Sequence, residues 1–372
     1  MSTSKMYDYI CETPAVLHRI IDTRKEIVRE FVEFYKDKTI DQIYLLGSGT
    51  SYHAGVNAKR YLEEVLQKKV FPMYPTQFNR NEIVFDKNTL VIGISQGGQS
   101  LSTVEGLDSA KNQGLFTAAV SENPSALIFR HADTKTRICV DNEKCGAKTK
   151  GFAGSTLTIE IMLTELALAK GEISETTAQT YYQRMIRVID NLGNIILAAD
   201  KWYECIREDF LPARRIIVVG YDNNYGSVLE GALKILETVR QGVTGYDIEE
   251  FFHGIYNSIT EDSYLFYLAS KGDYKERTEK LIEILGEWTP HNYLIGSPDG
   301  IRCISDRYCL VDFTEDPLFS CWEYIIPLQI VSCRAAADLG RNPDIPKDPN
   351  FHARIGSKDL DGIRDHYEAD PS

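Results

Sequence analysis

The sequence has 372 residues, of which 43% are hydrophobic and 26% are charged, and its formal net charge is −13. This length and balance are typical of a globular protein with two or three domains, and the negative charge argues against nucleic acid or an anionic membrane as the main partner. No apolar run is long enough to span a membrane, and the N-terminus lacks the basic and apolar regions of a secretory signal.

The eight cysteines are scattered, and none of them forms a CxxC pair or a Cys/His cluster with the spacing of a zinc site. Several lie within apolar runs, which is typical of small core residues in a reducing compartment. We therefore expect a cytoplasmic protein without a metal site.

The first half of the chain alternates between strand and helix patterns. A helical segment over residues 1–38 comes first. Short apolar runs predict strands at 41–46, 88–94, 115–120 and 136–140, and the intervening patterns predict helices at 52–67, 101–112, 125–131 and 154–170. This βαβα order predicts an α/β fold with a parallel sheet covered by helices on both faces.

The second half repeats the pattern after a long helical stretch. Strands are predicted at 215–220, 263–268, 292–296 and 308–313, and a helix at 318–339 that Pro327 should kink or divide. A second copy of the same module is the expected interpretation. The predicted organisation is an N-terminal helical segment, a module, a helical connector, a second module and a polar tail that wraps the surface or a partner subunit, at 1–38, 39–172, 173–210, 211–340 and 341–372.

Two small polar loops follow predicted strands of the first module. Gly47-Ser-Gly-Thr-Ser51 and Ser95-Gln-Gly-Gly-Gln-Ser100 each lead into a helix. Because parallel strands end at one edge of a sheet, we expect both loops to present amides and hydroxyls to a phosphate there, rather than to act only as helix caps. Neither loop has the spacing of a dinucleotide or nucleotide phosphate motif. The corresponding loop of the second module, Asp222-Asn-Asn224, is poorer in hydroxyls and is not expected to bind phosphate.

Candidate catalytic residues lie in the stretch 229–254. Glu230, Lys234 and Glu237 are spaced by four and three residues, so one helical face carries all three beside an apolar stripe. His253 follows sixteen residues after Glu237. Together they could form an acid/base set, although Glu230 and Lys234 could also be a surface ion pair and His253 a structural histidine.

Two further basic side chains have open interpretations. Lys148, in the segment before the helix at 154–170, could reach an anionic substrate or could be a solvated loop lysine. His53 is interpreted as a residue of a helix start.

These motifs, in this order, resemble the SIS (sugar isomerase) family of phosphosugar-binding domains, and they are similar to the isomerase half of glucosamine-6-phosphate synthase. The similarity is carried by Gly49-Thr-Ser-Tyr52, Ile94-Ser-Gln-x-Gly98, Leu229-Glu-Gly-Ala-Leu-Lys234 with Glu237, and His253-Gly254. It implies two tandem SIS modules, each a flavodoxin-like parallel sheet.

The resemblance also implies roles for individual residues. Loop residues would hold the 6-phosphate, Glu237 would move a proton between C1 and C2 of an open-chain sugar, and His253 of a neighbouring subunit would assist ring opening. A homodimer or larger homo-oligomer with a shared site is expected, and no cofactor is needed. The remaining residues implied for substrate binding are Gly49, Thr50, Ser51, Ser95, Gln96, Gly97, Ser100, Glu230 and Lys234.

Departures from the synthase pattern point to a catabolic branch. The chain starts almost at the first SIS module, so no glutamine amidotransferase domain is expected. Gly97 replaces a serine, Gln99 replaces a glutamate, and the synthase's C-terminal lysine falls near Phe351 or His352. Stand-alone double-SIS proteins resemble fructosamine 6-phosphate deglycases, such as those acting on fructoselysine or glucoselysine 6-phosphate.

We therefore expect a deglycase that cleaves a fructosamine 6-phosphate to an aldose 6-phosphate and a free amine through Glu237. The alternatives are an aldose–ketose isomerase or an amino-sugar phosphate deaminase, which would use the same carboxylate. A non-catalytic sugar-phosphate sensor is disfavoured, because the sequence has no basic helix-turn-helix pattern and carries both Glu237 and His253.

Overall fold

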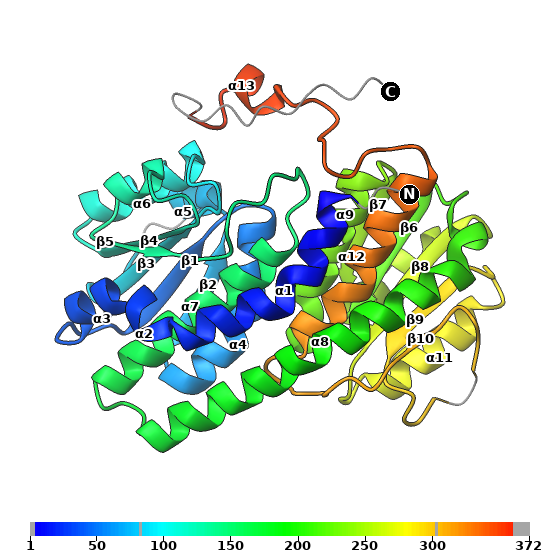
Figure 1. Cartoon of the computed structure of the whole chain (residues 1–372), viewed down its shortest axis with the longest axis horizontal. Helices are drawn as coiled ribbons and strands as arrows, with labels where there is room; N and C mark the ends of the chain where they lie inside the picture. Colours follow the sequence, from blue (N-terminus) through cyan, green and yellow to red (C-terminus); the bar gives the residue numbers. More distant parts are fainter. Residues whose placement is uncertain (1–3, 82–83, 302–303, 360–372) are drawn as a thin grey trace.

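The computed structural model describes residues 4–81, 84–301 and 304–359, and these form two α/β modules side by side (Figure 1). Each module contains a five-stranded sheet in which every pairing is parallel. The strand orders are β2-β1-β3-β4-β5 and β10-β9-β8-β6-β7. In each sheet the order in which strands are added therefore reverses at the first strand of the module, β1 or β6. The strands are β1 Gln42–Leu46, β2 Lys69–Met73, β3 Thr89–Ile94, β4 Phe116–Ser121, β5 Thr134–Arg137, β6 Arg215–Gly220, β7 Gly242–Asp247, β8 Ser263–Ala269, β9 Asn292–Gly296 and β10 Cys309–Leu310.

Helices cover both faces of the sheets and join the modules. The helices are α1 Lys5–Asp22, α2 Arg24–Ile27, α3 Arg29–Tyr35, α4 Thr50–Leu66, α5 Pro75–Asn81, α6 Leu101–Asn112, α7 Lys150–Ala169, α8 Glu175–Phe210, α9 Tyr225–Thr238, α10 Ile248–Phe252, α11 Lys275–Leu285, α12 Cys321–Asp338 and α13 Phe351–Ile355. This architecture confirms the expected fold of tandem SIS-like modules.

The central strands were predicted because they are continuously apolar and buried. Every residue of β1, β3, β8 and β9 is buried, as expected for strands covered on both faces. The sequence prediction missed the edge strands β2 and β7, which are partly exposed and contain Pro72 or two glycines. Proline is tolerated only at such edges, and mixed composition hides the strand pattern.

Several predicted helices differ from those observed. The stretch 1–38 forms three helices, because the backbone leaves helical geometry at Thr23 and Val28, where ψ is 8° and 2°. The Thr23 hydroxyl and amide both donate to the Arg19 carbonyl, at 2.7 and 3.0 Å, and these bonds close the last turn of α1. The expected helix at 125–131 is only a 3-10 turn, Leu127–Arg130. Pro327 does not divide the last helix, since α12 runs through it.

The helices between the sheets hold the two modules together. In Figure 1, α1 and α12 lie between the sheets, and the long α8 runs past both of them. Helix α4 of the first module packs against α9 of the second. Contrary to the sequence expectation, one described helix, α7, is long and apolar enough to cross a membrane by length and composition. However, 89% of its apolar window is buried inside the protein, so it is a core helix.

The tail after α12 returns to the first module. The Gly146 amide donates to the Asp344 carbonyl at 2.8 Å. Further along, the Leu101 amide donates to the Ser357 carbonyl at 3.2 Å, and the Asp359 amide donates to the Gln99 carbonyl at 3.1 Å. The tail therefore crosses the space between the modules and contacts the second polar loop of the first one.

Candidate active site

The two polar loops of the first module lie at the carboxyl ends of adjacent strands. β1 and β3 pair in parallel, and the strand order reverses between them, which is where ligands bind in open α/β sheets. Glycine is required at two turns. Gly49 has a φ of 55°, and Gly98 has a φ of 74°, where an added Cβ would lie 2.2 Å from Ala126. The prediction that both polar loops lie at the same edge of the first sheet is therefore confirmed.

Hydroxyls of the second loop already take part in hydrogen bonds within the protein. The Ser95 hydroxyl accepts from the Gly98 amide at 3.2 Å, and the Ser100 hydroxyl accepts from the Thr103 hydroxyl at 3.1 Å. At Gly97, an added Cβ would meet no atom within 4 Å. The position where the synthase pattern has a serine is therefore open space next to the loop.

Gln96 is held by a carboxylate that the sequence did not reveal. Its Nε2 donates to Glu143 Oε2 at 2.8 Å, while its side-chain carbonyl is buried and has no hydrogen-bond partner in the part of the chain that the structure describes. Glu143 also accepts from the Thr149 and Gly151 amides at 2.8 and 3.0 Å, at the start of α7. An acid at a helix N-terminus is favourable, so Glu143 fixes both the helix start and the loop.

The charged face of α9 meets the start of α4. Thr50 Oγ1 donates to Glu230 Oε1 at 3.0 Å, and His53 Nδ1 lies 2.7 Å from Glu230 Oε2. Lys234 donates to Thr50 Oγ1 at 3.3 Å and to Glu237 Oε2 at 2.6 Å. The polar face is therefore a connected buried network and not a solvated ion pair.

Burial and charge set the protonation of this network. The side chains of Glu230 and Lys234 are 0% and 1% exposed. Burial alone would raise the pKa of Glu230, but the Lys234 charge and the bonds from His53 and Thr50 outweigh it, and the pKa falls below its usual value. Burial would lower the pKa of Lys234, yet the two carboxylates raise it above its ordinary value. Both groups are therefore ionised at neutral pH.

Glu237 differs from the other carboxylate of the network, Glu230, because it is accessible and its pKa is raised. Its side chain is 34% exposed. Partial burial raises the pKa of the Glu237 carboxyl, and the Lys234 ammonium counteracts that rise without cancelling it. A carboxyl with this pKa direction, at the open end of a rigid network, is suited to exchange protons with a bound molecule.

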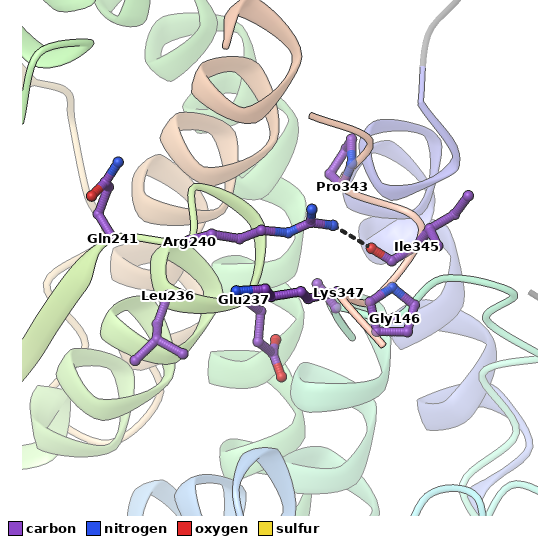
Figure 2. Close-up of a pocket in the computed structure, with 10 residues that line it drawn as sticks. Gly146, Leu236, Glu237, Arg240, Gln241, Pro343, Ile345 and Lys347 are labelled. Carbon is purple, nitrogen blue, oxygen red and sulfur yellow. Dashed lines mark hydrogen bonds between the residues drawn. The ribbon is translucent and has the colours of Figure 1, made fainter. Parts of the chain in front are cut away.

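Glu237 opens onto a cavity of about 370 Å³ between the end of α9, the segment before α7 and the tail. Figure 2 shows Arg240 extending toward the tail, where its guanidinium donates to the Ile345 carbonyl at 2.9 Å. Arg240 has a φ of 55°, an unusual conformation for a long side chain. The basic residues Arg240 and Lys347 line the cavity together with apolar residues. The full lining is Gly146, Ala147, Leu236, Glu237, Arg240, Gln241, Pro343, Ile345, Pro346 and Lys347.

Two predicted site residues lie apart from this cavity. Lys148 donates to the Glu143 carbonyl at 2.6 Å and supports the loop. His253 is 76% exposed and lies 3.7 Å from Glu249. Because α9 precedes β7, Glu237 is at the amino edge of the second sheet, whereas His253 follows β7 and α10 at its carboxyl edge. His253 and Glu237 of one chain therefore do not meet.

Sequence reasoning also missed residues that the fold brings to the network. His53 was interpreted as a helix-start residue, yet it contacts Glu230 across 177 positions of the chain. Its four-residue spacing from Gly49 places it one helical turn into α4, but nothing in the spacing indicates the partner. Arg240 likewise carried no signal, because the cavity forms only when the tail packs against α9. In the sequence, Lys347 is only close to, but out of register with, the position of the synthase's C-terminal lysine, and the structure places it at this cavity.

Comparison with protein families and curated proteins gives a consistent picture. The family described as "SIS domain" matches residues 38–165. The glutamine–fructose-6-phosphate aminotransferase (isomerizing) of Bacteroides thetaiotaomicron is 27% identical over 356 residues, which cover 92% of this chain and 57% of that protein. The enzyme of the same name from Zymomonas mobilis is 26% identical. The chain spans about half the length of these curated relatives.

Solved structures match over nearly the whole chain. A crystal structure of a candidate phosphosugar isomerase from Clostridium difficile has 34% identity and a TM-score of 0.88, covering 95% of this chain and 99% of the other. A candidate sugar-binding protein from Salmonella typhimurium has 30% identity and a TM-score of 0.79, covering 88% and 98%. The C-terminal domain of glucosamine-fructose-6-phosphate aminotransferase from Francisella tularensis, at 20% identity and a TM-score of 0.78, shares the fold.

Proposed function

Since this chain belongs to the SIS domain family of phosphosugar isomerases, we propose that it is a deglycase that cleaves a fructosamine 6-phosphate to an aldose 6-phosphate and a free amine. The observation that carries this proposal is the accessible Glu237, held by Lys234 next to the polar loops and open to a cavity with room for a substituent on the sugar. A plain isomerase needs no such room beside the carboxylate.

The phosphate end would be held by the first module. Ser51, Ser95, Ser100 and the surrounding amides lie at the switch point of the sheet, where a dianion is favoured by helix N-termini and hydroxyl donors. Lys234 links this edge to Glu237 through Thr50. A sugar phosphate anchored there would therefore place its reacting carbons on the side of the carboxylate.

The chemistry needs one proton shuttle and one water. The substrate has a ketone at C2 and a secondary amine on C1. Glu237 removes a proton from C1 while water protonates the C2 oxygen, which gives an enaminol. Glu237 then returns the proton to C2, which gives a protonated C1 imine, and loss of the proton on nitrogen to water balances the one taken up by the C2 oxygen. Water adds to the imine and the C–N bond breaks, so the balance is fructosamine 6-phosphate plus water to aldose 6-phosphate plus amine.

The far side of the cavity fits an amine that carries a carboxylate. Arg240 and Lys347 line the cavity together with Leu236, Pro343 and Ile345. Guanidinium and ammonium groups pair with carboxylates, and apolar walls accept a side chain. We therefore propose that the amine released is an amino acid.

His253 enters this proposal through a second copy of the chain. The side chain is exposed at an edge of the second module that Glu237 does not reach within one chain. A homo-oligomer that places His253 of one copy over the sugar of another would complete the site for ring opening. The free cysteines among the described residues suit a cytoplasmic location, which we also propose.

The test is release of aldose 6-phosphate from fructosamine 6-phosphates of several amino acids, with fructose 6-phosphate and glucosamine 6-phosphate offered in parallel. A deglycase releases glucose 6-phosphate or its epimer only from the fructosamines. Turnover confined to the plain sugar phosphates would overturn the deglycase and leave the isomerase or deaminase, which the aminotransferase relatives favour.

Sharing of the site between copies is tested by mixing two inactive variants, Glu237→Gln and His253→Ala. Subunit exchange should restore part of the activity, because one site of the mixed oligomer then contains both native side chains. No recovery after exchange has been verified by mass would contradict the shared site.

A further inference from the structure

The second module has its own loop edge, built like the phosphate edge of the first. Counting from the glycine at each strand end, Gly47 and Gly220, the third residue of each loop has a positive φ, 55° at Gly49 and 52° at Asp222. A tyrosine follows at the same offset in both, Tyr52 and Tyr225. The second loops also correspond, with Ser95-Gln-Gly-Gly after β3 and Ser270-Lys-Gly-Asp after β8.

The helix packing makes this second edge a counterpart of the active site. Thr50 contacts Glu230 and Lys234, whereas Asn57 donates to Ser227 at 3.1 Å, so α4 and α9 run antiparallel. The start of α4 therefore meets the end of α9 at Glu237. By the same geometry, the start of α9 meets a later part of α4, which carries Arg60.

A cavity of about 290 Å³ lies at this counterpart position, and both loops, Arg60 of α4 and the segment before α12 line it. The Asp222 carboxylate lies close to the second loop, since a Cβ added at Gly272 would be 3.3 Å from Asp222 Oδ2. The lining is Arg60, Asp222, Asn223, Asn224, Ser270, Lys271, Gly272, Asp273, Glu315, Pro317 and Ser320.

The first loop here presents a carboxylate and side-chain amides where that of the first module presents hydroxyls. Gly49-Thr-Ser51 is replaced by Asp222-Asn-Asn224 at equal offsets. The side-chain oxygens of Asn223 and Asn224 are buried and have no hydrogen-bond partner within the described residues. The amide of Asn223 is oriented, because its Nδ2 donates to the Leu318 carbonyl. These two acceptors remain free to accept from the N–H or O–H groups of a ligand.

The charges lining the cavity are of both signs, with the cations Arg60 and Lys271 beside the carboxylates Asp222, Asp273 and Glu315. Glu315 already accepts from the Lys271 amide at 2.8 Å and from the hydroxyls of Ser297 and Tyr324 at 2.7 and 3.0 Å. Clusters of three His, Cys, Asp or Glu side chains suited to a metal ion are absent from the described ranges. The pattern favours an organic ammonium group over phosphate and over a metal ion, and the two cations suit a carboxylate on the same molecule.

We propose that this cavity is a second small-molecule site and that it binds a free α-amino acid. Its ammonium group lies toward Asp222, Asn223 and Asn224, and its carboxylate lies toward Arg60 and Lys271. The proposal does not depend on the deglycase reaction, because it concerns the opposite end of α9 from Glu237.

The experiment measures the thermal midpoint and calorimetric binding of the full chain with each common α-amino acid in turn, at millimolar concentration. The best binder is compared with the matching amine that lacks the carboxylate and the matching acid that lacks the amine. A ligand of the native state raises the midpoint, and both truncated analogues should bind at least roughly tenfold more weakly, since each loses a charge-assisted contact.

Variants locate the site. Asp222→Gly and Arg60→Met should each weaken binding by roughly tenfold or more. Glycine suits the positive φ of position 222, so this variant should fold. Asp262→Asn, at the opposite edge of β8, is the matched control and should bind normally.

Three results would overturn the proposal. The first is that no amino acid binds. The second is binding that survives both Asp222→Gly and Arg60→Met. The third is binding that is lost in Arg240→Met, because the amino acid would then occupy the active-site cavity that Arg240 lines. Only this last result would leave the deglycase supported and the second site rejected.

Discussion

The loop edges of the two modules share a backbone shape but carry opposite chemistry. The first edge has hydroxyls and glycines, Gly49-Thr-Ser51, and the second has Asp222-Asn-Asn224 at the same offsets. Both turns use a positive φ at their third residue. A repeated module therefore keeps the strand–turn–helix geometry, while a few side chains change the polar groups that its edge presents.

The helices that follow these loops, α4 and α9, occupy equivalent positions in their modules, but equivalent glutamates on them have different surroundings. A glutamate lies seventeen residues after each strand-end glycine, Glu64 on α4 and Glu237 on α9. Glu64 is exposed and accepts from the Tyr181 hydroxyl at 3.1 Å, whereas Glu237 is bonded to the buried Lys234. The difference in surroundings predicts that only one of them acts on a substrate.

The largest effect is expected on turnover, when the equivalent glutamates Glu237 and Glu64 are each substituted. Glu237→Gln should lower kcat by roughly 10²- to 10⁴-fold with little change in substrate binding, because it removes the proton shuttle. Glu64→Gln should leave kcat near the native value. Steady-state kinetics and calorimetric binding test both variants, and near-native turnover by Glu237→Gln would refute the assignment.

The next largest effect is expected on stability, when the lysine is removed from a buried and from an exposed Glu–Lys ion pair with the same spacing in a helix. Lys234→Met should destabilise the fold by about 3–5 kcal/mol, because Glu230 is left buried without its cation. Lys280, which pairs with Glu276 at 3.0 Å on the surface of α11, is the matched case. Lys280→Met should not change denaturant stability measurably. Equal stabilities of the two variants would contradict the buried network.

A smaller effect should separate phosphate recognition from the rest of the site. Ser51→Ala should raise KM by roughly 10- to 100-fold with kcat changed less, since it removes a hydrogen bond to a charged phosphate. Ser125→Ala, an exposed serine outside both loops, is the control. An unchanged KM in Ser51→Ala would move the phosphate away from this edge.

The smallest effect is a shift in pH dependence. The raised pKa of Glu237 means that the ionised base is lost at a higher pH than for an ordinary glutamate, so kcat/KM should fall early on the acid side. Removing the neighbouring cation disfavours the ionised form, so in Lys234→Met the acid limb should move to still higher pH. A pH–rate profile of the folded variant shows the direction, and a shift to lower pH would contradict it.

Much of the fold could be predicted from the local sequence pattern, and the predictions that failed did so for physical reasons. Buried central strands such as β3 and β8 are continuously apolar and were predicted. The edge strand β7, Gly242–Asp247, has a mixed composition because one side faces solvent, and it was missed. The single helix predicted over 1–38 was wrong, because the backbone leaves helical geometry at Thr23 and Val28.

For the site, spacing alone determined that Glu230, Lys234 and Glu237 share one face of a helix, and that two polar loops follow neighbouring strands. Only the tertiary structure decided that this face is buried against α4, that His53 contacts Glu230, and that the tail brings Lys347 to the cavity of Glu237. Periodicity depends on near neighbours in the chain and can be read from them. Contacts between residues more than a hundred positions apart depend on how helices and modules pack, which local pattern does not encode.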